Sequence, residues 1–212
     1  RQMCIRDRST DVSLIAGGRP DLASMIKIDG LPVKTPVIDI VTVGAGGGSI
    51  VWRDDGGLLR VGPLSAGAIP GPVCYMRGGK SPAITDAHLI RGTLRTETFL
   101  GGKMAVDGNK SLLSFNTLSE EFNLKHEEIA DSAIRLAEAN IVRAIQQVST
   151  ERGRDPREYV LVPFGGAGPL HAARVAEELN IQRVVVPVNA GVLSASGLLL
   201  SDYLHFRSRT YR

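Results

Sequence analysis

The residues best suited to bind an anion lie in the glycine turn Phe164-Gly165-Gly166-Ala167-Gly168-Pro169. A short apolar run precedes the turn and a helix is expected after it, so backbone N–H groups and the positive end of a helix dipole would face a ligand. Glycines let a ligand approach the backbone, and Pro169 lacks only an N–H that a first helical turn leaves unbonded. The alternative is a tight strand-to-helix turn that serves packing, and the spacing leaves both interpretations open.

A second glycine segment, Gly44-Ala45-Gly46-Gly47-Gly48-Ser49, is similar to a dinucleotide-binding fingerprint. Its third glycine position holds serine, and Ile50-Val51-Trp52 and a hairpin turn follow it where the fingerprint needs a helix. Because that fingerprint binds only when it opens a helix, a Rossmann dehydrogenase is disfavoured. The segment either approaches a ligand or forms a wide structural turn.

Four further side chains could carry chemistry. Asp86 and His88 are close enough in sequence for an Asp/His site, although Thr85 or Asp86 also suits the start of a helix, which is the favoured interpretation. His171 belongs to the first turn after the glycine turn and faces either a ligand or the core. Cys74 has no His or Lys near it in sequence, so a nucleophilic role is disfavoured. No HExxH or CxxC metal spacing and no Gly-x-Ser-x-Gly elbow occurs.

The elements that must position these residues follow from the hydrophobic pattern. We expect strands over 12–15, 37–43, 49–53, 58–61, 159–164 and 183–188, and helices over 119–152, 170–179 and 192–203. The two strands over 49–53 and 58–61 form a hairpin, and a long ordered loop follows over 62–79. The order strand, glycine turn, helix, strand in the last third predicts an α/β fold in which both strands are buried.

The composition excludes several classes of protein. Of the 212 residues, 43% are hydrophobic and 22% charged, which is typical of a globular domain and excludes intrinsic disorder. The net charge is +3, but residues 1–8 carry +2 and residues 207–212 carry +3, so the body between them carries −2. A body without basic excess offers no footprint for a phosphate backbone, and nucleic-acid binding is disfavoured.

Two cysteines, Cys4 and Cys74, cannot form a disulfide framework, so a reducing, cytoplasmic compartment is expected. The longest nearly apolar run, over 191–200, is about half of the ~20 residues that a membrane span needs. The first residues also lack the apolar core of a signal peptide. No membrane association is expected.

Taken together, the motifs resemble the hydantoinase A/oxoprolinase family, which includes ATP-dependent 5-oxoprolinase, N-methylhydantoinase and subunits of acetone and acetophenone carboxylases. The similar segments are 43–50, 60–63, 65–68, 70–75, 85–87, 164–172, 191–195 and 200–202. The resemblance covers about residues 9–211, nearly the whole chain.

The resemblance implies an α/β fold of the actin, heat-shock chaperone and sugar-kinase type (ribonuclease H-like), with an inserted Gly/Pro-rich hairpin and loop. The segment 9–15 resembles the end of a phosphate-binding hairpin, 164–171 the adenosine-binding turn, and 191–200 the connecting helix. The implied cofactors are ATP and Mg²⁺. The implied nucleotide-binding residues are Ser9, Thr10, Asp11, Gly165, Gly166, Ala167 and Gly168; the catalytic candidates are Asp11 and Asp86; the substrate-side candidates are Gly46, Gly47, Gly48 and His88. Asp11 could hold the metal or a water, and the metal ligands are otherwise unassigned.

Three departures from the family pattern qualify this interpretation. Ile5-Arg6-Asp7-Arg8 stands where an acidic residue and Gly-Gly-Thr are expected, so we interpret residues 1–8 as a non-native scar. Residues 9–212 are then an internal fragment of an ATPase domain, incomplete at both ends and expected to be inactive alone. Ile69 stands where the family pattern has Asp, and His88 where it has Asn.

The function that the resemblance implies is ATP-dependent hydrolysis of a cyclic amide, a hydantoin or 5-oxoproline, through phosphorylation of its carbonyl oxygen. A hydantoinase B-type partner subunit or domain and an oligomeric assembly are expected. The alternatives are a subunit of an ATP-dependent ketone carboxylase and a non-catalytic ATPase-fold scaffold, which Ile69 and the altered hairpin would favour.

Overall fold

The computed structural model describes residues 9–28, 31–34 and 36–203; the segment 1–8, interpreted above as a scar, lies outside them. The helices are α1 (Ile84–Ile90), α2 (Gly108–Ser114), α3 (Asn116–Phe122), α4 (His126–Val148), α5 (Gly168–Glu178) and α6 (Leu193–Leu200). The strands are β1 (Thr10–Val12), β2 (Ile15–Ala16), β3 (Arg19–Pro20), β4 (Leu22–Ala23), β5 (Ile26–Ile28), β6 (Leu31–Val33), β7 (Val37–Ile38), β8 (Val41–Val43), β9 (Ser49–Arg53) and β10 (Leu59–Ser65). Single 3₁₀ turns cover Val73–Tyr75, Phe99–Gly102, Thr150–Arg152, Pro156–Glu158 and Ala190–Val192.

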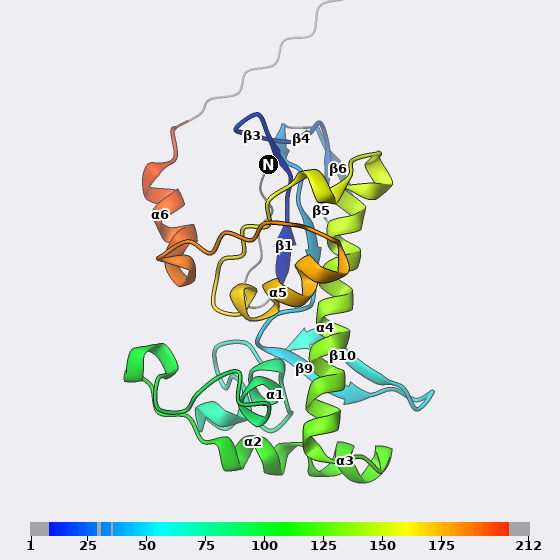
Figure 1. Ribbon diagram of the computed structural model, residues 1–212, viewed down its shortest axis with the longest axis vertical. Coiled ribbons are helices and arrows are strands. Elements are labelled where there is room, and N and C mark those ends of the chain that lie inside the picture. Colours follow the sequence, from blue (N-terminus) through cyan, green and yellow to red (C-terminus); the bar gives the residue numbers. More distant parts are fainter. Residues whose placement is uncertain (1–8, 29–30, 35, 204–212) are drawn as a thin grey trace, which may run out of the picture.

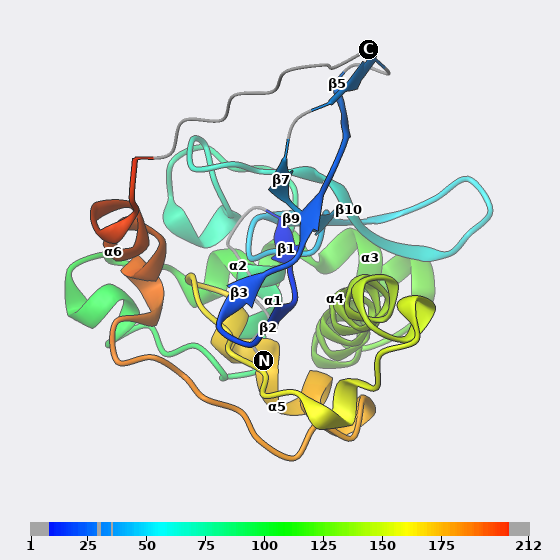
Figure 2. The ribbon, with the colours of Figure 1, turned by 90° about the horizontal axis from the view of Figure 1, so that it is seen from above.

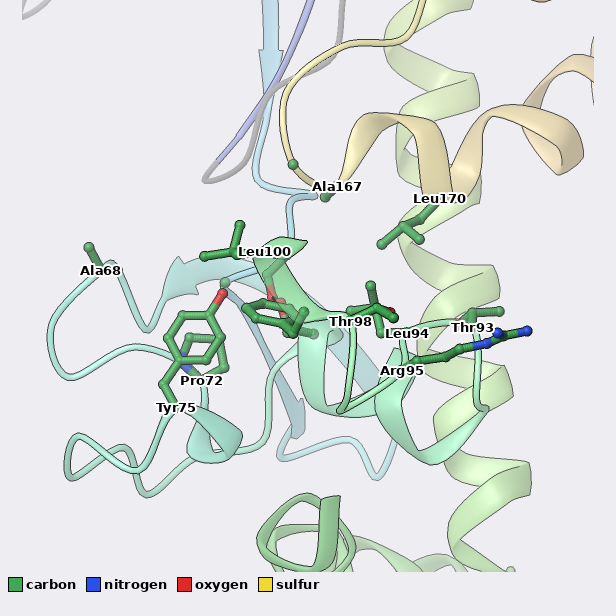
Figure 3. Close-up of a pocket in the computed structure, with 16 residues that line it drawn as sticks. Ala68, Pro72, Tyr75, Thr93, Leu94, Arg95, Thr98, Leu100, Ala167 and Leu170 are labelled. Carbon is green, nitrogen blue, oxygen red and sulfur yellow. Dashed lines mark hydrogen bonds between the residues drawn. The ribbon is translucent and has the colours of Figure 1, made fainter. Parts of the chain in front are cut away.

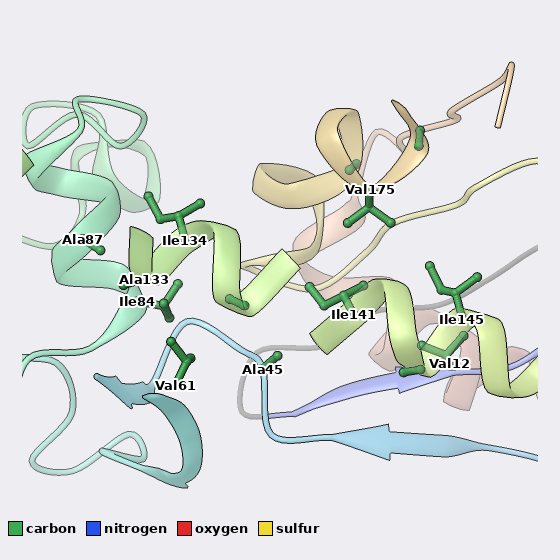
Figure 4. Close-up of a cluster of buried hydrophobic side chains, with 14 of the residues drawn as sticks. Val12, Ala45, Val61, Ile84, Ala87, Ala133, Ile134, Ile141, Ile145 and Val175 are labelled. Atoms are coloured by element: carbon green, nitrogen blue, oxygen red, sulfur yellow. The ribbon is translucent and has the colours of Figure 1, made fainter. Parts of the chain in front are cut away.

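The helix α4 runs along the long direction of the structure (Figure 1). It packs against α1, α3, α5, β1, β8 and β10. Its buried residues recur at helical spacing and include Ile129, Ala133, Ala137, Ile141 and Ile145. Figure 4 shows how this face is used: α1 and β10 pack at one end of the helix, and β1 and α5 pack at the other. One continuous core therefore connects the two glycine segments through a single rigid helix.

The expected helix over 119–152 is in fact interrupted. Asn123 adopts a left-handed conformation with φ +52° and ends α3, and α4 then begins after Lys125. The Glu128 carboxylate accepts a hydrogen bond from the Lys125 N–H at 2.8 Å, which satisfies a donor at the start of α4. Apolar periodicity on both sides of Asn123 concealed the break, because a left-handed asparagine costs little and interrupts no apolar position.

The strands form antiparallel pairs. β1 pairs with β8, with Thr10 opposite Val43, and the predicted hairpin is confirmed as β9–β10. Strand β10 continues to Ser65 past an irregularity in register, so the expected loop over 62–79 begins later. The remaining pairs, β2–β3, β4–β7 and β5–β6, are formed by strands of two or three residues within the first forty residues.

The prediction of two buried strands in the last third is wrong in part. Segments 159–164 and 183–188 meet at one parallel bridge, where the Leu161 N–H donates to the Arg183 carbonyl at 3.0 Å and the Val185 N–H to the Leu161 carbonyl at 2.9 Å. Leu161 is fully buried, whereas Val186 is 52% exposed and Val188 fully exposed. An apolar run reveals that a segment suits burial, but not whether another element covers it.

The helix α6 ends at Leu200 and not near Tyr203 as expected. None of its residues is buried, and both views place it apart from α4 (Figures 1 and 2). Within the described residues, no helix is both long and apolar enough to cross a bilayer.

Candidate functional site

A cavity of about 870 Å³ brings the two glycine segments together. Gly47 and Gly48, from the turn before β9, line one part of it, and Gly166 and Ala167, from the turn before α5, line another. These are two of the three predicted substrate-side glycines and two of the four residues predicted in the adenosine-binding turn. Segments about 120 residues apart in sequence therefore line the same cavity. The volume of this cavity falls in the range of small-molecule sites.

The rest of the lining is mostly apolar with a few hydroxyls. The contributing side chains are Pro72, Tyr75, Thr85, Thr93, Leu94, Arg95, Thr98, Phe99, Leu100 and Leu170. The Tyr75 and Phe99 rings contact each other with centroids 5.7 Å apart. Figure 3 shows Leu170 extending from α5 toward Leu94 and Thr98 on the opposite side.

The wall that contains Gly47 is held by hydrogen bonds to its backbone. Ser49 Oγ accepts from the Gly46 N–H at 2.9 Å and donates to the Gly44 carbonyl at 3.0 Å. Both the N–H and the hydroxyl of Thr85, in the first turn of α1, donate to the Gly47 carbonyl, at 2.8 and 2.9 Å. The serine in the third glycine position therefore closes a structural turn, and α1 fixes the position of this wall.

The wall that contains Gly166 leads directly into α5. Gly165 has φ +82°, and its N–H donates to the Ala190 carbonyl at 2.8 Å. Pro169 lies in the first turn of α5, as predicted. Gly168 is buried at the start of the helix, so Gly166 and Ala167 are the two members of the turn that line the cavity. Gly166 is exposed and Ala167 is buried, and both precede the N-terminus of α5. The adenosine-binding role of this turn stays a prediction.

The other predicted nucleotide residues do not line this cavity. Thr10 is buried in β1, where its hydroxyl donates to the Ala45 carbonyl at 2.5 Å, and Asp11 accepts from the Thr42 hydroxyl at 2.7 Å on β8. Ser9 precedes them in the chain. Their nucleotide-binding role remains a prediction.

Asp86, a predicted catalytic residue, is fully buried and does not line the cavity. Its Oδ1 accepts from the Cys74 N–H at 2.8 Å and from the Ser111 hydroxyl at 2.9 Å. Its Oδ2 accepts from the Val73 N–H at 3.1 Å and from the Ala83 N–H at 3.0 Å. Asp86 therefore lies in the first turn of α1, as the favoured interpretation predicted. It occupies the third helical position, and Ala83 is the N-cap. Four donors joining three segments give this carboxylate a structural role.

Cys74 is buried beside that carboxylate. Burial, and then the nearby charge of Asp86, raises the pKa of the Cys74 thiol well above its usual range. The thiol therefore stays protonated, which fits the sequence prediction that Cys74 is not a nucleophile.

His88, predicted on the substrate side, lies behind the cavity wall and is 1% exposed. Its Nδ1 is 2.8 Å from Thr93 Oγ1, and its ring lies 4.9 Å from the ring of His171, centroid to centroid. Burial, followed by the nearby His171 and Arg174, lowers the pKa of His88 to about 3. His171 is fully buried, with Nδ1 3.4 Å from Glu138 Oε1, so it faces the core and not the ligand.

The segment 93–100 contributes cavity residues that the sequence did not indicate. Leu100 and Gly101, which follow Phe99, adopt left-handed conformations with φ +49° and +66°. The Gly101-Gly102 pair is the signal that could have revealed a sharp turn here, since glycines commonly permit such conformations.

Within the part of the chain that the structure describes, no three His, Cys, Asp or Glu side chains are grouped to hold a metal ion. The described carboxylates do not assemble a Mg²⁺ site. Mg²⁺ ligation is therefore assigned to no residue.

The sequence model of the family described as Hydantoinase/oxoprolinase matches residues 8–207. An uncharacterized protein of Methanocaldococcus jannaschii is 47% identical over 88% of this chain, which spans 27% of that protein. The alpha subunit of caprolactamase from Pseudomonas jessenii is 40% identical over 92% of this chain, which spans 28% of it. The 5-oxoprolinase of Dictyostelium discoideum is 37% identical over 92% of this chain, which spans 16% of it.

Two solved structures share the fold. The nucleotide-free structure of an acetone carboxylase, from a study of ATP-dependent acetone carboxylation, superposes with a TM-score of 0.87 and 29% identity over 95% of this chain and 29% of that one. The crystal structure of the ATP-dependent caprolactamase of Pseudomonas jessenii superposes with a TM-score of 0.81 and 40% identity, over the same shares. The predicted α/β ATPase-type fold is confirmed by these superpositions.

Proposed function

Because the chain belongs to the hydantoinase/oxoprolinase family, we propose that the protein containing it uses ATP to hydrolyse a cyclic amide. The observation that carries the proposal is the cavity on which the two glycine segments meet. Gly166 and Ala167 would contact the adenosine end of ATP, and Gly47 and Gly48 the side on which the acceptor binds. The caprolactamase and 5-oxoprolinase relatives support a lactam or related ring as the acceptor.

The chemistry requires activation because resonance makes an amide carbonyl a poor electrophile. Transfer of the γ-phosphoryl group to the carbonyl oxygen releases ADP and converts that oxygen into a leaving group. One water then attacks the carbonyl carbon, and the ring C–N bond breaks with protonation of nitrogen, which leaves an acyl phosphate. A second water hydrolyses this acyl phosphate to phosphate and the open amino acid. The glycine walls contribute positioning and backbone N–H groups to this sequence, which is what phosphoryl transfer mainly demands of a protein.

The chain spans between 16% and 28% of the lengths of the curated relatives with assigned activities. We therefore assign to it the nucleotide half of the reaction. A hydantoinase B-type partner subunit or domain would complete the hydrolytic half, as the alpha-subunit designation of the caprolactamase relative suggests.

A ketone carboxylase is the second candidate, and the superposition on acetone carboxylase favours it. Both reactions share phosphorylation of a carbonyl oxygen and differ in the acceptor and in what attacks next. A non-catalytic scaffold is the third candidate, supported by Ile69, which is 83% exposed where the family pattern has an acidic residue.

Phosphate release separates the three. We expect the complete protein with its partner to release phosphate from ATP when caprolactam, hydantoin or 5-oxoproline is added, with one ring opened per phosphate. Release that depends on acetone and bicarbonate instead would establish the carboxylase alternative. No acceptor-dependent release with any of these compounds would contradict both enzyme assignments and favour the scaffold.

Replacing Gly166 with valine is expected to weaken ATP binding by about tenfold or more, because the new side chain would enter the cavity where the nucleotide approaches the backbone. Isothermal titration calorimetry with ATP measures the effect. The matched control is Gly197→Val in α6, where an added Cβ meets nothing within 4 Å. Unchanged ATP affinity in a folded Gly166→Val protein would remove the glycine turn from the nucleotide site.

A further inference from the structure

Two buried imidazoles lie behind the walls of the cavity. Among the residues that the structure describes, the Nε2 atoms of His88 and His171 have no hydrogen-bond partner, although the rings are 1% and 0% exposed. A buried polar atom without a partner destabilises the fold. A pair of such atoms in contacting rings indicates that the contact itself serves a purpose.

The hydrogen bonds fix the protonation of the His88 ring. The Thr93 hydroxyl donates its single proton to the His88 carbonyl at 3.0 Å, so it can only accept at His88 Nδ1, 2.8 Å away. Nδ1 therefore carries the ring proton, and Nε2 keeps its lone pair. The depressed pKa of His88 means that this neutral form persists through the physiological range.

The His171 ring is fixed in the same way from the other side. Its Nδ1 is 3.4 Å from the Glu138 carboxylate, which can only accept while it is ionised, so Nδ1 again carries the proton. Arg174, on α5, lies 3.6 Å from the same carboxylate, which belongs to the buried Glu138 of α4. Each ring is thus oriented by a hydrogen bond on the side away from its Nε2.

The ring contact connects the two walls of the cavity. Thr85, one turn before His88 in α1, holds the Gly47 carbonyl through two hydrogen bonds. His171 follows Gly166 and Ala167 within the first turn of α5. A displacement of either helix would reach the opposite glycine wall through two rigid, buried rings.

We propose that His88 and His171 form a positioning pair that sets the spacing between the Gly47–Gly48 wall and the Gly166–Ala167 wall. The pair contacts neither ATP nor the acceptor. It transmits the position of α1 to the start of α5 through the ring contact, and the Thr93 and Glu138 hydrogen bonds hold the rings in register. The spacing itself is a property of this chain, and its kinetic consequence rests on the proposed function.

Amide hydrogen exchange tests the pair without any assay of activity. His88→Asn keeps a donor near Thr93 but removes the ring, and is expected to raise exchange about tenfold in segment 164–170, whose Gly165 and Leu170 amides are hydrogen-bonded. His171→Asn should raise exchange at Thr85 in return, since coupling between two sites is reciprocal. His88→Phe, which keeps an aromatic ring but loses the Thr93 hydrogen bond, should raise exchange in segment 164–170 less than His88→Asn does. His126→Asn, at a half-buried histidine bonded to Asn116 on the first turn of α4, is the matched control.

The kinetic arm uses the complete protein and the acceptor that supports phosphate release. His88→Asn is expected to lower kcat about 10–100-fold with less than threefold change in ATP affinity, because misplacement by about an ångström costs that much. The double variant with His171→Asn should be no slower than the slower single variant. The proposal would be overturned if His88→Asn raised amide exchange only in α1, or if the Asn and Phe variants at position 88 raised exchange in segment 164–170 equally. A wild-type protein without phosphate release would contradict the proposed function alone, and the exchange result would still decide the pair.

Discussion

Replacing Asp86 with alanine is expected to lower the free energy of unfolding by about 3–5 kcal/mol. The four donors that this carboxylate satisfies, on Val73, Cys74, Ala83 and Ser111, would remain buried without an acceptor. Such a loss is a large share of the 5–15 kcal/mol that stabilises a typical domain. Urea unfolding of wild type and variant, followed by circular dichroism, measures it.

The substitution also separates a structural Asp86 from a catalytic one. Asp86→Asn keeps the shape but turns an N–H₂ group toward donors, so about 2 kcal/mol of destabilisation is expected. The matched control is Asp55→Asn at the exposed tip of the β9–β10 hairpin, which should stay within about 0.5 kcal/mol of wild type. An Asp86→Asn protein with unchanged stability but lost phosphate release would show that the carboxylate acts on the reaction.

Local patterns predicted the elements whose causes are local. The β9–β10 hairpin follows from Asp54-Asp55-Gly56-Gly57, where Gly57 has φ +81° and its N–H donates to the Asp54 carbonyl at 2.9 Å. The start of α5 at Pro169 follows equally from the residues next to it. The family resemblance assigned one glycine segment to the nucleotide and the other to the acceptor, but it did not predict that both line one cavity.

Features that depend on distant partners could not be predicted. Asp86 resembles an ordinary helix-start residue in sequence, and its role depends on Cys74 and Ser111, 12 and 25 positions away. The contact of His88 with His171 spans 83 residues and needs both α1 and α5 to pack on α4. Likewise, the exposure of Val186 depends on what lies over its strand, which no local pattern encodes.

These distant contacts also fix the positions of the two glycine walls that line the cavity. Each glycine wall has few side chains of its own, so its position must be fixed from behind. Asp86 anchors α1 to the segment around Cys74, Thr85 ties α1 to Gly47, and His88 meets His171. Backbone that must approach a ligand closely is thus supported by buried polar groups that never touch the ligand.

The stability of the protein is expected to fall between about pH 6.5 and pH 3, partly because of His88. In the fold its pKa is lowered to about 3, whereas in the unfolded chain it is near 6.5. The unfolded state therefore binds a proton in this window that the folded state does not. The contribution is fully present above pH 6.5, falls by up to about 1.4 kcal/mol per pH unit below it, and levels off below pH 3.

Two neighbouring groups on α5, His171 and Arg174, favour the neutral form of His88. Arg174 in turn pairs with Glu138 and Asp131 on α4. His88→Asn removes the titration, so the difference in unfolding free energy between wild type and variant should shrink as the pH is lowered from 7 to 4.5. Carboxylates that titrate in the same window cancel in that difference. If the His88→Asn curve were parallel to that of wild type, the His88 imidazole would titrate normally inside the fold, and the neutral, lone-pair-bearing ring would have to be abandoned.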